Sequence, residues 1–398
     1  YRAPSQFQFQ FQFRMGASTA STEEASTYSA VALQSSVQEL KKVLAKEYMS
    51  FFSPMRTEYY SPGVTFLDPM TTLEGVEGYQ KNVDMLASRT TLGKFLFQDA
   101  LINLHSVEGG TTNIVNGVPK IEDLQTRWTL KVTAKVFPWK PTAVFTGVSI
   151  YKVEATGPKG VQVVGQLDYW DSINIQPGSE GKYQSVPTNV AVQDFVGQLK
   201  PPTFGGNAQA AGPELPFSLL RRGDGYDVRR YPAYTAVRLP YTRRDEGFGS
   251  LGSFTRGMNP MAPALMEVPT KEEANKYMMW PLTFVAPGQE KEGGAPDESP
   301  LLTEARANAG TGQWRTMEIV TIPESVVAVA TLTDVSMGPV VRMADAQLRK
   351  VLARDGLEPF STPSLNSAPG VRFAQYDAVF SMGQRRSEVW IDLSKHPW

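Results

Sequence analysis

Four side chains in this 398-residue chain can be nominated as general acids or bases, namely Tyr59, Asp68, His105 and Asp168. No two of them stand at a spacing that by itself demands catalysis, and a lone histidine on a strand is more often structural than reactive. The chain has no cysteine and only two histidines, His105 and His396. Thiolate catalysis, disulfides, iron–sulfur clusters and a histidine-rich metal site are therefore excluded, and catalysis is an alternative here, not the main prediction.

The stretch "GYDVRRYPAYTAVRL" (225–239) places charge and aromatic rings on what reads as a half-exposed strand kinked at Pro232. Arg229, Arg230 and Tyr234 can face either solvent or the mouth of a pocket. The net charge is −1, and each basic pair is diluted by nearby acidic or apolar residues. Nucleic-acid binding, which needs clustered Lys and Arg, is therefore not expected. The other basic pairs are 221–222, 243–244 and 385–386.

Residues 36–173 have the pattern of one α+β unit. A capping box (Ser36, Glu39) and apolar residues at helical spacing predict a helix over 36–52, and a second amphipathic helix is predicted over 74–89. Because the helices precede a long antiparallel meander, we expect a curved sheet that wraps around them and leaves a cone-shaped cavity. Strands are predicted at 63–69, 95–107, 121–136, 144–155 and 160–173.

The segments that flank this unit differ from it in composition. Residues 1–35 are rich in Ser, Thr and Ala, contain two arginines and have no acidic residue before Glu23, as in an organelle transit peptide or its remnant. A disordered tail without a task is the alternative. Residues 174–216 are rich in Pro and Gly and are predicted to be a linker, interrupted by one short helix at 190–199. No apolar run is long enough to predict a membrane-spanning helix.

Residues 217–398 form a second unit that contains an internal echo. "VRRYPAYTAVRL" (228–239) and "EIVTIPESVVAVATL" (318–332) each have the pattern of two strands that meet at a proline. A helical stretch follows each of them, at 243–256 and at 338–356.

Each copy then leads to a strand that bears a tryptophan, at 276–285 or at 387–393. Two such copies predict one pseudo-symmetric, distorted β-barrel with two helices outside it. Between the copies, the charged and Gly-rich residues 286–313 are predicted to be a flexible insertion.

Four motifs of the second unit resemble, in order, those of the SOUL heme-binding protein family. They are "GYDVRRYPAYTAV", "FGSLGSFTRGMNP", "MMWPLTFVAPGQ" and "YDAVFSMGQRRSEVWIDL", and they cover about 217–393. The first unit, with "YYSPGVTFLDPMTTLEGVEGYQ", is similar to an uncharacterised domain of the SnoaL-like, nuclear-transport-factor-like group. This pairing resembles SOUL proteins of plants and algae, which are commonly plastid proteins. It implies a chloroplast location, in the stroma, at the thylakoid surface or on plastoglobules.

The resemblance implies noncovalent binding of heme or another tetrapyrrole in an apolar groove between the first helix and the loop before the closing strand. Burial of the flat macrocycle supplies most of the affinity, and basic side chains at the rim pair with its propionates. Carried over by motif, the groove residues are Phe248, Leu251, Gly252, Thr255 and Tyr376, with Met258, Met261 and Met266 as its floor. The candidates for the rim are Arg229, Arg243, Arg244 and Arg256.

Two features depart from the family's pattern. Some members were proposed to ligate iron through a histidine, whereas this unit holds only His396, which cannot lie on the first helix. The first helix also contains several glycines, each of which costs about 0.5–1 kcal/mol relative to alanine in a helix interior. We therefore expect a soft helix and a ligand held without histidine. The glycines are Gly247, Gly249, Gly252 and Gly257.

The main prediction is a noncatalytic protein that buffers or transports a tetrapyrrole in the plastid. One alternative is an adaptor, without tetrapyrrole, that associates peripherally with plastid lipid bodies or thylakoids through its Phe/Gln-rich tail. The other is a hydrolase of a chlorophyll derivative or a small ester, since SOUL-like folds include hydrolases and SnoaL-like cones often use an Asp or His as acid or base.

Overall fold

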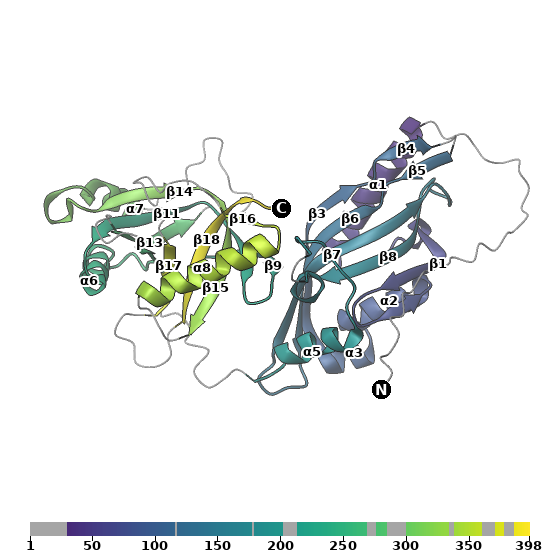
Figure 1. Ribbon diagram of the computed structural model, residues 1–398, viewed down its shortest axis with the longest axis horizontal. Helices are drawn as coiled ribbons and strands as arrows, with labels where there is room; N and C mark the ends of the chain where they lie inside the picture. Colours follow the sequence, from purple (N-terminus) through teal and green to yellow (C-terminus); the bar gives the residue numbers. More distant parts are fainter. Residues whose placement is uncertain are drawn as a thin grey trace, which may run out of the picture.

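The computed structural model contains two sheet-rich domains that lie side by side (Figure 1). Residues 1–29 of the predicted tail and residues 286–299 of the predicted insertion lie outside the described part of the chain. The described residues are 30–115, 118–176, 179–201, 213–268, 276–284, 300–333, 338–359, 371–377 and 386–398.

The N-terminal domain is built on a six-stranded sheet of order β2-β1-β8-β7-β6-β3, in which β1 runs parallel to β8 and the other pairs are antiparallel. The four long strands of the predicted meander are confirmed as β3, β6, β7 and β8. Its strands are β1 (Tyr60–Leu67), β2 (Thr72–Glu74), β3 (Phe97–Gly109), β6 (Leu124–Ala134), β7 (Thr142–Glu154) and β8 (Gln162–Trp170), and β4 (Thr112–Val115) with β5 (Val118–Ile121) forms a separate hairpin.

Both predicted helices of this domain are present, and both pack on the sheet. α1 (Ala30–Met49) begins six residues earlier than predicted, and α2 (Val76–Leu86) covers most of 74–89. Helical spacing brings Leu40, Leu44 and Tyr48 of α1 to the sheet, where each is at most 2% exposed. The short helices are η1 (Thr57–Tyr59), α3 (Thr91–Leu96), α4 (Asp171–Asn174) and α5 (Thr188–Gln198), and α5 coincides with the helix predicted at 190–199.

The C-terminal domain is a sheet with the strand path β14-β11-β13-β12-β17-β18-β15-β10-β9. α6 (Arg244–Phe254), α7 (Pro300–Asn308) and α8 (Gly338–Arg354) pack against it. Its strands are β9 (Ser218–Arg222), β10 (Asp227–Tyr231), β11 (Tyr234–Tyr241), β12 (Ala264–Val268), β13 (Lys276–Phe284), β14 (Glu318–Ile322), β15 (Ser325–Thr333), β17 (Val371–Gln375) and β18 (Arg386–Lys395), and β16 (Glu358–Pro359) pairs with β18.

The two predicted copies are present, and they exchange their first strands. In one copy β11 pairs with β13 and β13 with β12, and in the other β15 pairs with β18 and β18 with β17. The opening strand β10 of the first copy pairs with β15 of the second, while β14 of the second pairs with β11 of the first. Within the described residues the path ends at β9 and β14, which do not pair with each other, so hydrogen bonds do not close the predicted barrel.

The sheet has an apolar core on each face. One core lies between the sheet and the helices and includes Leu251 and Phe254 of α6 and Leu348 of α8. The other lies on the opposite face and includes Tyr231, Tyr234 and Trp390. The end of the predicted insertion also differs from expectation, because α7 buries Leu302 and Ala305 instead of remaining a loop.

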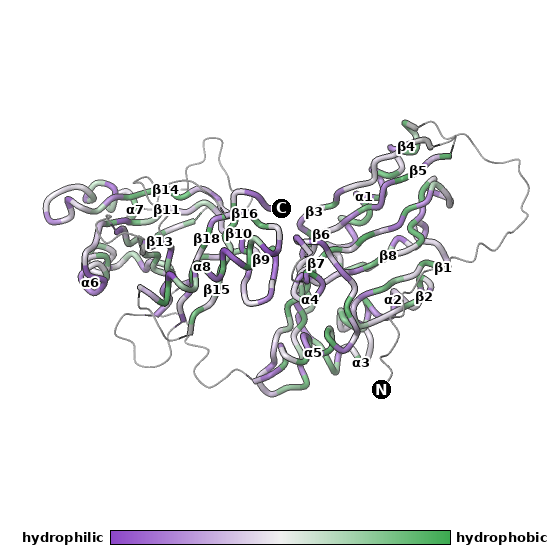
Figure 2. Tube along the Cα trace, in the orientation of Figure 1, coloured by the Kyte–Doolittle hydropathy of each residue, from purple (hydrophilic) through white to green (hydrophobic). Residues whose placement is uncertain are grey.

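The two domains meet through β9, whose hydrophilic end is purple in Figure 2. Asp171 of α4 is fully buried there and accepts hydrogen bonds from Arg127 Nη2 (2.6 Å), Thr146 Oγ1 (2.6 Å) and Tyr183 Oη (2.6 Å). Arg221 of β9 lies 3.9 Å from the same carboxylate. Burial opposes ionisation of Asp171, yet the two guanidiniums and the hydroxyl donors hold its pKa below the ordinary value.

Candidate functional site

The opening and closing motifs of the C-terminal domain meet in one buried cluster around Glu388. This carboxylate is 1% exposed and accepts hydrogen bonds from Arg229 Nη1 (3.0 Å), Tyr376 Oη (2.7 Å) and Trp390 Nε1 (2.8 Å). β15 lies between β10, which carries Arg229, and β18, which carries Glu388. The arginine–tyrosine strand thus contributes to a structural cluster, because its polar groups are satisfied inside the protein.

The cluster corrects one rim candidate. Arg229 is 6% exposed and is occupied by Glu388 and Asp227, so it cannot stand at the edge of a surface groove. Arg386 lies over the ring of Tyr376 at 3.7 Å and forms a bidentate pair with Glu214 (2.9 and 3.1 Å). Arg386 therefore begins β18 in an ion pair with Glu214.

The inner side of α6 belongs to the core. Leu251 is fully buried, and Thr255, at the end of the helix, turns its hydroxyl back to the Leu251 carbonyl (2.8 Å). Met266 of β12 is 2% exposed and packs in the same cluster. These three predicted groove residues line the interior of the domain and not its surface.

The outer side of α6 presents a different set of predicted residues. Phe248 and Trp280 of β13 are half-buried and meet edge to face, with ring centroids 5.6 Å apart. Gly252 is exposed, and a Cβ at this position would lie 3.9 Å from the Trp280 ring. The absence of a side chain at Gly252 therefore leaves part of that ring exposed. Met258 is half-buried and Arg256 exposed just beyond the helix.

The remaining predicted site residues lie elsewhere. Met261 and Tyr376 belong to the core on the opposite face of the sheet. Arg244 begins α6 and donates to Gln375 Oε1 (3.4 Å), and Arg243 is exposed beside Asp245 and Glu246. The structure thus distributes the set over two cores and one helix surface. The loop expected to face α6, at 378–385, lies outside the described residues.

The single histidine of this domain lies far along the chain from α6, at the edge of a hollow of about 490 Å³. His396 stacks on Trp398 there (5.7 Å), and Arg230 and Arg372 share the lining. Arg372 is ion-paired with Asp392. No group of three or more metal-ligating side chains occurs in the part of the chain that the structure describes.

Of the four acid–base candidates in the N-terminal domain, two line the same cavity and two do not. Asp68 and Asp168 line one cavity, whereas Tyr59 and His105 are not among its lining residues. His105 Nε2 is 2.8 Å from Thr129 Oγ1. Burial and the nearby arginine charges lower its pKa to about 4, so it is a neutral structural histidine at ordinary pH.

Sequence reasoning missed the aliphatic hydroxyl and amide residues of this cavity, which are Thr71, Asn82, Ser149 and Gln166. The signal for Gln166 was present in the sequence, since Gln166, Asp168 and Trp170 alternate along one strand and must share a face. Ser149 carries no comparable signal, because its role depends on the register of β7 against β8.

Family models match both halves of the chain. Residues 38–158 match the model described as "Uncharacterized conserved protein (DUF2358)". Residues 213–392 match the model described as "SOUL heme-binding protein". The chain thus carries a SOUL domain behind a DUF2358 domain, which confirms the pairing expected from the motifs. A search of curated proteins finds no match.

Solved structures give more distant likenesses. An NTF2-like protein of unknown function from Exiguobacterium sp. 255-15 is 13% identical, with a TM-score of 0.23 over 34% of this chain and 98% of the other. An NTF2-like superfamily protein from Salmonella enterica is 15% identical, with a TM-score of 0.26 over 34% and 91%. A hydrolase from Listeria innocua is 10% identical, with a TM-score of 0.29 over 46% and 94%. At such identities a likeness concerns the fold at most.

Proposed function

We propose that this protein binds heme or a related tetrapyrrole, noncovalently and without catalysis, and that it buffers or transports this ligand in the plastid. The observation that carries the proposal is the match of residues 213–392 to the SOUL heme-binding family. The geometry that supports it is the outer side of α6. There, the half-buried Trp280 and Phe248 rings form an apolar patch beside Gly252 on which a macrocycle can pack.

Charge at both ends of α6 suits a ligand that bears carboxylates. Arg244 is the first residue of the helix and the exposed Arg256 lies two residues after its last, so either end offers a guanidinium to the carboxylate edge of the ligand. Guanidinium groups pair well with propionates because they offer several donors in one plane. No histidine lies on α6, so the proposal is for a tetrapyrrole held by its faces and its carboxylates.

Titration of the full chain with hemin tests this proposal by the change in the Soret band. Gly252→Leu should weaken binding at least tenfold, since the leucine side chain would cover Trp280. The substitution should not unfold the helix, because leucine has a higher helix propensity than glycine. Gly63→Leu is the matched control, because no atom lies within 4 Å of a Cβ at this strand position in the other domain. A flat titration of folded protein, or equal binding by both variants, would contradict the proposal.

We also propose a chloroplast location, supported by the acid-poor composition of residues 1–35. Purification of the protein from its native organelle, followed by an absorption spectrum, tests location and ligand together. A pigment band at a tetrapyrrole wavelength is expected. Recovery of the protein outside plastids would contradict the location.

A second candidate function, association with a lipid surface, is favoured by exposed apolar side chains at one end of the N-terminal domain. Phe95 of α3 is 68% exposed, Trp139 of the β6–β7 turn 40% and Val196 of α5 50%. Backbone and indole hydrogen bonds connect these segments, from Lys135 N to Leu96 O (2.8 Å) and from Trp139 Nε1 to Leu199 O (3.0 Å). The lysines exposed around them are Lys94, Lys135, Lys140 and Lys200.

Exposed aromatic residues flanked by lysines suit the boundary of an anionic lipid layer. None of the described helices has the length and apolar character to cross a membrane, so the contact would be peripheral. Flotation with phosphatidylglycerol vesicles should recover the protein, and a Phe95→Ser, Trp139→Ser variant should remain at the bottom. A variant that lacks residues 1–29 tests whether flotation depends on this surface or on the N-terminal tail. Flotation that needs only the tail would reject the surface.

A further inference from the structure

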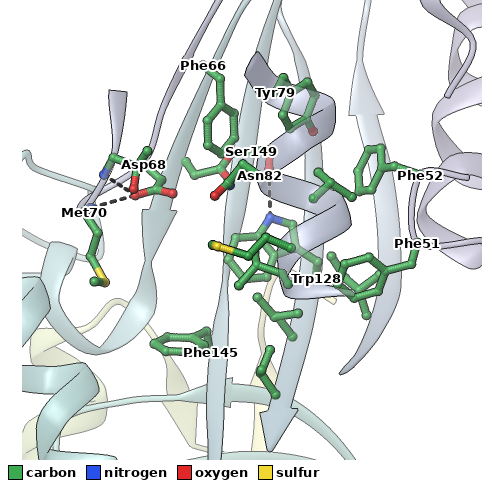
Figure 3. A pocket seen from close by; sticks show the side chains of 18 of the residues that line it. Phe51, Phe52, Phe66, Asp68, Met70, Tyr79, Asn82, Trp128, Phe145 and Ser149 are labelled. Carbon is green, nitrogen blue, oxygen red and sulfur yellow. Dashed lines mark hydrogen bonds between the residues drawn. The ribbon is translucent and has the colours of Figure 1, made fainter. Parts of the chain in front are cut away.

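The N-terminal domain encloses a cavity of about 250 Å³ between α2 and the inner face of the sheet. Figure 3 shows Tyr79 and Asn82 of α2 on one side, with Phe51 and Phe52, which follow α1, on another. Asp68 and Met70 lie at the opposite end of the view from Phe51 and Phe52. Among the lining residues, Asp68, Met70, Thr71 and Asn82 are part-exposed.

The walls of the cavity are aromatic and held in place. Phe66 stacks on Tyr79 (4.8 Å), and Phe145 packs on Trp170 (4.5 Å). Trp128 donates its indole N–H to Ser149 Oγ (2.8 Å), which satisfies the polar atom and fixes the ring (Figure 3). Packed aromatic rings therefore form much of the cavity wall.

The polar groups of the cavity include two carboxyl groups. Asp68 Oδ1 accepts from the backbone N–H groups of Met70 (2.6 Å) and Thr71 (2.7 Å), and Asp168 Oδ1 accepts from Gln166 Nε2 (2.9 Å). None of the described residues that line the cavity is Lys, Arg or His. The carboxyl groups therefore lack a cationic partner within the cavity.

Gln166 supplies a third hydrogen-bond acceptor in the cavity. Gln166 is 4% exposed, and its Oε1 is buried without a hydrogen-bond partner in the described structure. Such an atom normally costs free energy unless something donates to it. Burial, reinforced by the charge of Asp68, also raises the pKa of Asp168 to about 7. Both observations indicate acceptors that the lining residues leave incompletely satisfied, in a cavity whose lining carries no positive charge.

We propose that this cavity binds a small molecule with an apolar body and a protonated amine, the amine lying between Asp168, Asp68 and Gln166 Oε1. The ammonium group supplies the missing donors and charge, and the aromatic walls attract its positive charge while they bury the body. The volume limits the body to about the size of one aromatic ring with a short chain. This site is independent of the SOUL domain.

Three probes with one body and different head groups test the proposal on the full chain by calorimetry. They are 2-phenylethylamine, 2-phenylethanol and 3-phenylpropionate. The amine should bind at least tenfold more tightly than the alcohol at pH 8, and the carboxylate should not bind. Equal affinity for amine and alcohol, tighter binding of the carboxylate, or no binding of any probe at millimolar concentration would overturn the proposal.

Variants separate the acceptors from the walls. Asp168→Asn should weaken amine binding at least tenfold and change alcohol binding less than twofold, whereas exposed Asp123→Asn should change neither. If Asp168→Asn does not fold, Asp68→Asn replaces it, because its side-chain oxygen can still accept from the two backbone amides. Amine binding unaffected by both Asp168→Asn and Asp68→Asn would refute the site. Hemin should not compete with the amine, so failure of the tetrapyrrole proposal leaves this result intact.

Discussion

At the scale of single residues, Glu388 shows how a buried charge is accommodated. Arg229 of β10, Tyr376 just after β17 and Trp390 of its own strand donate to it, and Arg229 supplies the nearest full positive charge. Removal of one partner from such a pair leaves a buried charge without compensation. The pair therefore constrains which strands can be neighbours.

Arg229→Met should lower the free energy of unfolding by about 3 kcal/mol, because Glu388 would remain buried without its nearest cation and with only Arg386, at 3.8 Å, to replace it. Arg243→Met is the matched control. Arg243 is 67% exposed in its ion pairs, so its loss should cost less than about 1 kcal/mol. Urea unfolding followed by circular dichroism measures both values. Equal losses would show that the buried pair contributes no more than a surface pair.

Asp168 should make stability depend on pH. Its pKa is raised to about 7 in the folded protein, so between pH 4 and pH 7 the folded state binds more protons than the unfolded state. The free energy of unfolding should therefore fall as pH rises through this window and change no further above it. The free energy of unfolding should fall by on the order of 2 kcal/mol over this window. This value is smaller than the full pKa shift would give, because the cavity is open to water.

Comparison of the wild type with Asp168→Asn isolates this effect, since other titrating groups contribute equally to both. The variant should gain stability relative to the wild type between pH 5 and pH 8. Thermal melts at four pH values suffice. A constant difference across that range would mean that Asp168 is ionised throughout.

The placement of a residue was predictable where it follows from side-chain alternation within one strand. It was not predictable where it depends on how several strands pair. The shared face of Gln166 and Asp168 follows from their spacing. The burial of Arg229 does not, because its partner is 159 residues away and is reached only through the pairing of β10, β15 and β18. A charged residue in an alternating strand looks exposed until that pairing is known.

At the scale of elements, α6 combines glycines with opposite roles. A Cβ on Gly247 would lie 3.0 Å from Met278 Cε and 3.1 Å from Tyr241 Cβ, so this glycine permits close packing of helix on sheet. A Cβ on Gly249 would meet no atom within 4 Å. Gly249 and Gly252 are therefore the helix positions at which a side chain can be added without a clash.

Gly249→Ala and Gly252→Ala should each raise the free energy of unfolding by about 0.5–1 kcal/mol, because alanine restricts the unfolded chain and adds no contact that clashes. Gly247→Ala is the internal control and should be neutral or destabilising. Chemical denaturation distinguishes the three. Stabilisation by Gly247→Ala equal to that of the others would show that the helix does not press on Met278.

Most elements were predictable because their periodicity is strong, as for the meander of the N-terminal domain and for α8. The exceptions are short. α3 has six residues, and β4 and β5 four each, which is too few for a period to be seen. α7 was missed because the composition around it suggested a loop, although Leu302 and Ala305 stand three apart.

At the scale of the whole molecule, the buried cluster around Asp171 joins the two domains. Arg127 and Arg221 come from different domains, and the ring of Trp398 lies 4.8 and 5.1 Å from their guanidinium carbons. Leu219 and Leu220 of β9 also accept hydrogen bonds from Thr129 and Arg127 through their carbonyl groups. The domains are therefore expected to unfold as one unit.

Asp171→Ala should cost about 3–5 kcal/mol and separate one calorimetric transition into two, because two buried guanidiniums would lose their shared anion. Asp224→Ala is the control, since this carboxylate is 76% exposed beside Arg354 and its loss should leave a single transition. Two transitions already in the wild type would disprove the coupling.

The strand exchange within the SOUL domain has a consequence for how this half of the molecule can be made. Each copy contributes one strand to the sheet of the other. If the chain were cut between the copies, β15 would lose its pairing with β10, and β11 would lose its pairing with β14, so each fragment would expose unpaired backbone N–H and C=O groups. Separately expressed halves should aggregate when alone and become soluble only when they are mixed. The domain is therefore suited to use as a split reporter.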